Sequence, residues 1–154
     1  MNHIKIQTEI LKNTLNKKEN NWKVTYDEGE NVVYLVDPAN AMIVKVSGDD
    51  FILDIELLEK WGVGSISLET IRNIFGGGGY LPADLTGDIS TNLPGVKANA
   101  QAQKVKNENA ELWVDRKYIA FFEKDCSFEI MRDKTPVRVI ENGEIAGVIM
   151  PINR

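Results

Sequence analysis

The sequence has very few of the residues that build covalent or metal cross-links. Its 154 residues include one cysteine, Cys126, and one histidine, His3. A single cysteine forms no internal disulfide, so nothing indicates the cross-linked scaffold of a small secreted protein. One histidine and one cysteine, far apart in the sequence, do not supply the ligands of a usual zinc site. We therefore expect no metal centre and no cofactor.

Long apolar runs are missing as well. No stretch approaches the roughly 20 apolar residues that cross a bilayer, and the first residues, Met1 to Lys5, lack the apolar core of a signal peptide. These absences predict a cytoplasmic protein without a membrane partner. Proline is scarce, with five residues, and an apolar fraction of 43% is enough for a folded core. The length predicts a single domain, residues 1–154.

Positive charge is outnumbered, because 18 Lys and Arg face 23 Asp and Glu, a net charge of −5. This balance disfavours a protein that attracts nucleic acid with its whole surface. Basic residues do cluster locally in two expected helices: Lys12, Lys17 and Lys18 in the first, Arg116 and Lys117 in the second. These clusters are either contacts for a DNA phosphate backbone or ordinary solvated helix faces.

The first half of the chain predicts the order β-α-β-β-β. Ile4 and Ile6 alternate with polar residues, which indicates a strand over 3–7. Thr8 is expected to cap the helix that follows. Alternating and apolar runs then predict strands at 22–26, 31–36 and 42–46.

The second half predicts the same order, and the two units together give an α+β fold. We expect a strand at 111–114, a helix that begins after Asp115, and strands at 127–131, 136–140 and 145–152. The last two strands flank Asn142-Gly143, a pair that favours a type I′ hairpin turn because both central residues need a positive φ.

The middle of the chain is expected to be less regular. Helices are predicted at 51–61 and 67–75, and the run Gly76 to Gly79 ends the second. Proline, glycine and small residues predict a flexible segment or insert over 76–109. The glycine run does not open a helix, and no Lys-Ser or Lys-Thr follows it, so a hinge is favoured over a phosphate-binding loop.

No catalytic centre stands out. His3 lies at the end of the chain and is expected to be an exposed strand residue, whereas a catalytic histidine must sit in a cleft. The carboxylates of Asp49, Asp50, Asp54 and Glu56 lack the alternate ligand spacing and central glycine of a calcium loop. We interpret them as solvated turns and expect no enzyme; a metal-dependent enzyme at these carboxylates is a third hypothesis.

Three segments carry a family resemblance. They are His3-Ile4-Lys5-Ile6 with Thr8-Glu9-Ile10-Leu11-Lys12, then Val114-Asp115-Arg116-Lys117-Tyr118-Ile119, and finally Gly147-Val148-Ile149-Met150-Pro151-Ile152. They resemble a strand-helix opening, a helix start and the closing hairpin of the bacterial DNA polymerase III beta sliding clamp. The subunit of that family has three such domains, and this chain has the length of one. The resemblance implies a single clamp-like domain of a phage-type or mobile-element relative. Such a domain would close a ring only as a homo-oligomer.

The resemblance also implies a function. It is a non-enzymatic binding domain of DNA replication or repair, whose partners are duplex DNA and short peptide motifs of polymerases or other DNA enzymes. The five basic residues named above would hold DNA. In the clamp family the closing hairpin lines an apolar peptide pocket, and the matching residues are Val148, Met150, Pro151 and Ile152. Strand alternation equally allows Val148 and Met150 to pack in the core. The alternative function is a phage-type inhibitor or interaction module that does not bind DNA.

Overall fold

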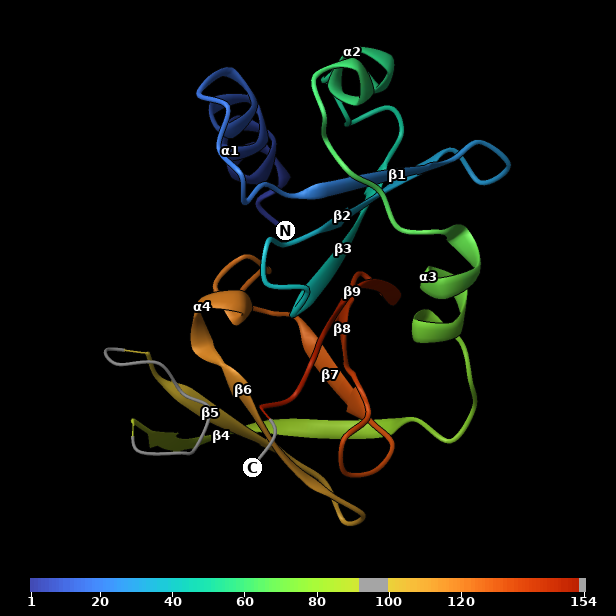
Figure 1. Cartoon of the computed structure of the whole chain (residues 1–154). Coiled ribbons are helices and arrows are strands. Elements are labelled where there is room, and N and C mark those ends of the chain that lie inside the picture. Colours follow the sequence, from blue (N-terminus) through green and yellow to red (C-terminus); the bar gives the residue numbers. More distant parts are fainter. Residues whose placement is uncertain (92–99, 153–154) are drawn as a thin grey trace. The chain divides into compact units, whose positions relative to one another are not determined.

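Helices and antiparallel strands together give the protein an α+β fold, as expected (Figure 1). The structure is a computed structural model that describes residues 1–91 and 100–152. The chain divides into two compact units. The N-terminal unit is Asn2–Phe75, and the C-terminal unit contains Met1 together with the residues from Gly76 onward.

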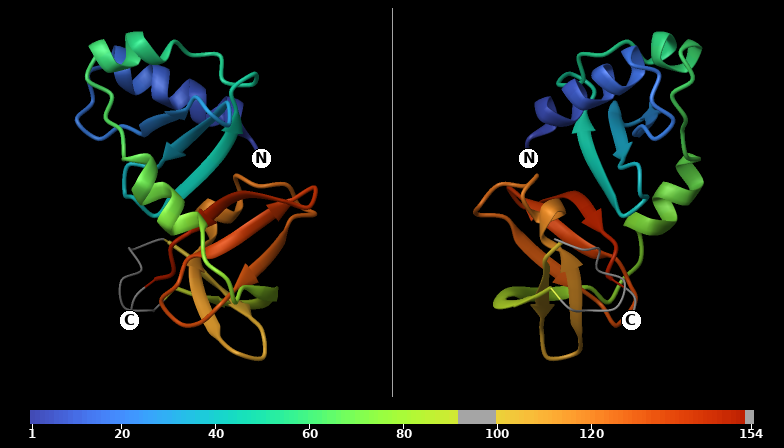
Figure 2. Two further views of the ribbon diagram at one scale, coloured as in Figure 1. Left: turned by 90° about the vertical axis from the view of Figure 1, so that its right-hand side faces the viewer. Right: turned by 60° about the vertical axis from the view of Figure 1, so that its left-hand side comes forward.

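The N-terminal unit is an antiparallel sheet with helices on both faces. Its strands are β1 (Lys23–Asp27), β2 (Val32–Val36) and β3 (Met42–Ser47), with β2 in the middle. Its helices are α1 (His3–Leu15), α2 (Ile55–Lys60) and α3 (Leu68–Phe75). Figure 2 shows α1 and α2 on one side of the sheet and α3 on the other. The expected strands near 22–46 and the helices near 51–61 and 67–75 are confirmed.

The strand expected over residues 3–7 is wrong, because α1 begins at His3. The Asn2 side chain accepts a hydrogen bond from the backbone N–H of Lys5 and caps the helix. Ile6 and Ile10, four residues apart, are fully buried on one helix face. Thr8, the expected cap, lies inside the helix and donates to the Ile4 carbonyl. The first unit therefore does not have the order β-α-β-β-β.

Both sheet faces of the N-terminal unit are closed by packing. Ile6 and Ile10 of α1 are fully buried, and so is Leu35 of β2. On the side of α3, the rings of Tyr34 and Phe75 meet edge to face with centroids 5.3 Å apart. Arg72 of α3 also pairs with the buried Asp27 at 3.3 Å.

The C-terminal unit is mostly strand. Its strands are β4 (Leu81–Ser90), β5 (Ala102–Lys106), β6 (Glu111–Asp115), β7 (Ser127–Ile130), β8 (Val137–Glu141) and β9 (Glu144–Ile149), and its helix is α4 (Arg116–Ile119). Neighbours across the described sheet run β9-β8-β7-β4-β5-β6. The order from β6 through α4 to β9 is β-α-β-β-β, which confirms the expectation for the second half.

The segment expected to be flexible contains two of these strands. β4 and β5 pair with each other in antiparallel register, and β4 also pairs with β7. Pro82 lies within β4, at the short stretch that pairs with β7. Residues 92–99, a part of the expected flexible segment, lie outside the described residues. Proline and glycine content was therefore a poor guide here, because backbone pairing from two neighbouring strands orders β4.

The hairpin expected at the end of the chain is confirmed. β8 and β9 pair so that Glu141 lies opposite Glu144, with Asn142 and Gly143 as the two turn residues. Their φ angles are +52° and +78°, as a type I′ turn requires.

Candidate functional site

A large hollow lies in the C-terminal unit, between β4, α4 and β7. It has a volume of about 800 Å³, within the range of ligand pockets. Its apolar lining comes from Leu85, Ile119, Phe122 and Phe128, and we call it the α4 pocket. Phe122 and Phe128 are almost fully buried, whereas Leu85 is 36% exposed. The pocket thus has a rigid aromatic floor and an open apolar side.

A fork in the sheet creates the α4 pocket. β7 pairs with β4 only at Leu81–Ala83, and beyond Ala83 the two segments separate. Residues from the segment 116–128, which begins with α4, line the pocket between them. Asp115 begins α4 by accepting a hydrogen bond from the Lys117 N–H at 3.0 Å. This cap places Arg116 beside the opening of the fork.

Arg116 is held in place at the α4 pocket by neutral partners. Its Nη1 donates to Gln101 Oε1 at 2.6 Å, and its Nε donates to Gln103 Oε1 at 3.2 Å. Gln103 in turn donates to the Thr86 carbonyl at 2.8 Å. The guanidinium is therefore oriented by amide groups, which leave its positive charge uncompensated.

The one cysteine also lines the α4 pocket but is poorly suited to nucleophilic chemistry. Burial is the main cause that raises the pKa of the Cys126 thiol, and the carboxylates of Glu141 and Asp125 raise it further. A raised pKa keeps the sulfur protonated, and the thiolate is the nucleophilic form. Cys126 is therefore a weak nucleophile near neutral pH.

Lys117, the other predicted DNA-binding residue of this unit, contacts Asp115 and the Tyr118 ring. Its Nζ lies 3.9 Å from Asp115 Oδ2 and 4.9 Å from the centre of the Tyr118 ring. Arg116 lines the α4 pocket, and its sequence neighbour Lys117 does not. The two residues are therefore not part of one site.

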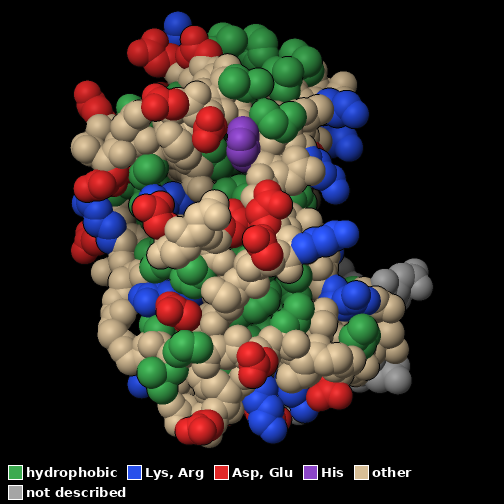
Figure 3. Space-filling model, turned by 180° about the vertical axis from the view of Figure 1, so that it is seen from behind, with side chains coloured by type: hydrophobic (Ala, Val, Ile, Leu, Met, Phe, Trp, Pro, Cys, Tyr) green, Lys and Arg blue, Asp and Glu red, His purple; other side chains and the backbone are tan. Residues whose placement is uncertain are grey.

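The other predicted DNA-binding residues lie at the end of α1 in the N-terminal unit. Lys17 and Lys18 line a hollow of about 280 Å³ together with Trp61, whose side chain is half exposed; we call it the Trp61 hollow. Lys12 is exposed on α1 itself. Figure 3 shows apolar side chains gathered at the end of this unit seen at the top, with Lys and Arg along the edge beside them. Sequence reasoning missed the tryptophan, which stands more than forty residues from the lysines.

The structure separates the four residues predicted to bind peptides. Val148 is fully buried in the core, and Met150 is half buried after the end of β9. Pro151 and Ile152 line a hollow of about 260 Å³ beside Trp113. The Ile152 N–H donates to the Trp113 carbonyl at 2.7 Å, so this tail runs along β6. Of these four residues, Pro151 and Ile152 are the ones that line this hollow.

The glycine run is held through its carbonyl groups. Arg138 Nη2 donates to the carbonyls of Gly76 and Gly77 at 3.1 and 3.0 Å. Its guanidinium also stacks on the Tyr80 ring, 3.6 Å from the centroid. A phosphate loop offers N–H groups, and here the carbonyls contact a cation. Arg138 thus holds the start of the C-terminal unit in place.

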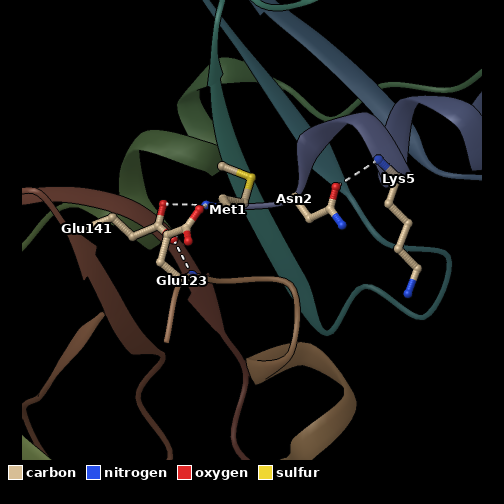
Figure 4. A network of polar contacts seen from close by, with 5 residues as sticks. All are labelled: Met1, Asn2, Lys5, Glu123 and Glu141. Carbon is tan, nitrogen blue, oxygen red and sulfur yellow. Dashed lines mark hydrogen bonds and ion pairs between the residues drawn. The ribbon is translucent and has the colours of Figure 1, made fainter. Parts of the chain in front are cut away.

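Met1 joins the C-terminal unit through an ion-pair network (Figure 4). Its ammonium lies 2.8 Å from Glu123 Oε1 and 2.9 Å from Glu141 Oε2. Burial acts to lower the pKa of this ammonium, but hydrogen bonds to both glutamates outweigh it, and the net pKa is raised. Glu141 also accepts from the Glu123 N–H at 2.7 Å, which fixes a segment lining the α4 pocket.

The other groups considered for chemistry have structural partners. Asp54 caps α2 by accepting from the Leu57 N–H at 3.1 Å, and His3 Nδ1 lies 2.9 Å from Gln7 Nε2. Within the described residues no group of three or more His, Cys, Asp or Glu is arranged to hold a metal ion. No helix of the part that the structure describes is long and apolar enough to span a membrane.

Comparison with protein-family models, with curated proteins and with solved structures finds no match to this chain.

Proposed function

We propose that this protein is a non-enzymatic binding domain that holds a short peptide segment of a partner protein in the α4 pocket. The supporting observation is the aromatic floor of that pocket, formed by Phe122 and Phe128, under a hollow of about 800 Å³. Apolar pockets with a few fixed polar groups are the usual binding sites for apolar side chains and ligands. An anchoring side chain buried in such a pocket supplies most of the affinity of a small interface.

The setting we propose is DNA replication or repair, with DNA enzymes as partners and a clamp-like C-terminal unit. The order of elements from β6 to β9 supports it, because it matches the β-α-β-β-β plan implied by the sliding-clamp resemblance. The helical start of the N-terminal unit counts against a second copy of that plan. The alternative is a phage-type inhibitor or interaction module that does not bind DNA, which would use the same pocket.

The proposal is tested by a substitution that fills the α4 pocket and leaves the buried core residues unchanged. Ala120 is exposed and lines the pocket, so Ala120→Trp places an indole in it. Random short peptides displayed on phage are selected on the full-length protein. We expect enriched peptides whose affinity falls at least about tenfold on Ala120→Trp. Ala39→Trp, at an exposed turn of the N-terminal unit, is the matched control and should bind normally.

Two outcomes of this selection contradict the proposal. One is a selection that enriches no sequence on the wild-type protein. The other is a set of enriched peptides that bind the wild type and Ala120→Trp equally, because they must then sit elsewhere.

A second proposal concerns the Trp61 hollow, where Lys17, Lys18 and an exposed indole come together. We propose that this hollow contacts DNA, with the lysines on phosphates and Trp61 available to stack on a base. Lysine contacts to phosphate release counterions, so affinity for a labelled duplex should fall steeply between about 50 and about 200 mM salt.

The matched variants for the DNA proposal each remove two positive charges. Replacing Lys17 and Lys18 by glutamine should weaken binding and flatten the salt dependence. Replacing Lys106 and Lys134, both exposed on the C-terminal unit, should change little. Salt-independent binding, or equal losses in both double variants, would contradict a specific role of this hollow. Single-stranded DNA serves as a parallel probe, and Trp61→Ala should affect it more than duplex.

A further inference from the structure

The cations at the α4 pocket point to the chemistry of its ligand. Arg116 and Lys124 both line the pocket. Among the described residues, the hydrogen-bond acceptors of the Arg116 guanidinium are the amide oxygens of Gln101 and Gln103. No ion pair to Arg116 or Lys124 occurs in residues 1–91 and 100–152. An arginine fixed in orientation but without a carboxylate partner is a prepared site for an anion.

The acidic residues around the α4 pocket do not neutralise these cations. The Glu123 carboxylate is paired with the Met1 ammonium at 2.8 Å. Asp84 lies opposite Lys106 across β4 and β5, and it is the strand neighbour of Leu85. Asp84 also lines the pocket, and in the residues that the structure describes it forms no ion pair with Arg116 or Lys124. Within this described part of the chain, Arg116 and Lys124 thus remain without a carboxylate partner at a pocket whose lining includes both acidic and basic residues.

We propose that the α4 pocket binds a peptide in which a large apolar side chain stands next to a carboxylate. The apolar side chain rests on Phe122 and Phe128, and the carboxylate receives hydrogen bonds from the Arg116 guanidinium. Lys124 adds charge at the rim. This inference rests on the proposed peptide-binding function and adds the acidic residue as the feature that the site selects.

The amide network makes the contact specific. Gln103 holds Arg116 and is itself anchored on the Thr86 carbonyl of β4, so the guanidinium sits at a fixed place relative to Leu85 on the same strand. A guanidinium held this way loses little side-chain entropy when it binds. A carboxylate that replaces the amide contacts or adds to them forms a charge-assisted hydrogen bond, stronger than its neutral counterpart.

The experiment uses the peptides selected on the wild-type protein. We expect the enriched sequences to carry Asp or Glu beside Leu, Ile, Phe or Trp. Replacing that Asp by Asn, or Glu by Gln, should weaken binding at least about tenfold. Arg116→Gln should cause a similar loss, and the two changes together should cost no more than either alone, as expected of a directly interacting pair in a double-mutant cycle.

Three controls keep the result interpretable. Arg132→Gln makes the same substitution at an exposed arginine of this unit outside the pocket, and its affinity should stay at the wild-type value. Arg116→Lys keeps the charge, so it should retain part of the preference for peptides with Asp or Glu over those with Asn or Gln. Circular dichroism melting of Arg116→Gln checks that the fold is intact, and a parallel titration with 4-phenylbutanoate asks whether a free apolar acid binds as well as the peptide.

The outcomes separate this inference from the proposed function. Enriched peptides that depend on the pocket but carry no acid, or that lose nothing on Arg116→Gln, overturn the acidic motif and leave peptide binding standing. Tighter binding of 4-phenylbutanoate than of any peptide overturns the peptide as the ligand. A selection that enriches nothing overturns both.

Discussion

Arg138→Met tests whether one arginine orders the start of the C-terminal unit. The substitution keeps an unbranched side chain of similar length and removes the charge and the donors. It therefore deletes the hydrogen bonds to the carbonyls of Gly76 and Gly77 and the stacking on Tyr80. Only 11% of the Arg138 side chain is exposed, although the carbonyls of Gly76 and Gly77 that it contacts are exposed.

The magnitude follows from these three contacts, because a fourth, an ion pair of Arg138 with Glu129 at 3.9 Å, is long and contributes little. Each hydrogen bond contributes about 1 kcal/mol, since both carbonyls are exposed enough for water to replace the donor. The cation–π contact at 3.6 Å contributes about 1 kcal/mol more. We therefore expect Arg138→Met to lower the free energy of unfolding by about 3 kcal/mol.

Urea unfolding followed by circular dichroism measures this change, with Arg132→Met as an exposed control that should alter stability by less than about 0.5 kcal/mol. Hydrogen exchange of the amides at Gly76 to Gly79 should also become faster in Arg138→Met, because the run loses its anchor. A loss below about 1 kcal/mol, with unchanged exchange in the glycine run, would refute the view that Arg138 holds it.

Three further substitutions address other parts of the fold. Asp37→Ala removes the carboxylate that accepts three backbone N–H bonds, at 3.1, 2.6 and 2.7 Å, and should cost about 3 kcal/mol in urea unfolding; a loss under about 1 kcal/mol would mean that water replaces it. Hydrogen bonds to glutamates, acting against burial, raise the pKa of the Met1 ammonium above its ordinary 8.0. A raised pKa gives stability that is present below that ordinary value and lost as pH rises through the folded-state value, so Glu141→Gln should flatten the pH dependence of unfolding above neutrality; an unchanged slope contradicts this. Gly143→Ala should cost about 1 kcal/mol because φ is +78°, whereas Gly87→Ala, with open space around it, should cost less, and equal thermal shifts would contradict the turn argument.

Local patterns in the sequence determined several elements of this protein. The Asn142-Gly143 pair predicted its hairpin because two successive positive φ angles are tolerated by few residue types. Asp115 predicted the start of α4 because a carboxylate can satisfy a free N–H of the first turn. The strands between Lys23 and Ser47 followed from alternation and apolar runs. Each of these signals is complete within a few residues.

Tertiary structure decided the rest. Ile4 and Ile6 fit either a strand or a helix, and burial of Ile6 with Ile10 selected the helix. β4 contains Pro82 and Gly87, and pairing with β5 and β7, which both come later in the sequence, ordered it nonetheless. The α4 pocket depends on where β4 and β7 separate, which no local pattern specifies. Arg116 was predicted from its charge alone; its amide partners and the aromatic floor beside it come from distant segments that only the folded chain brings together.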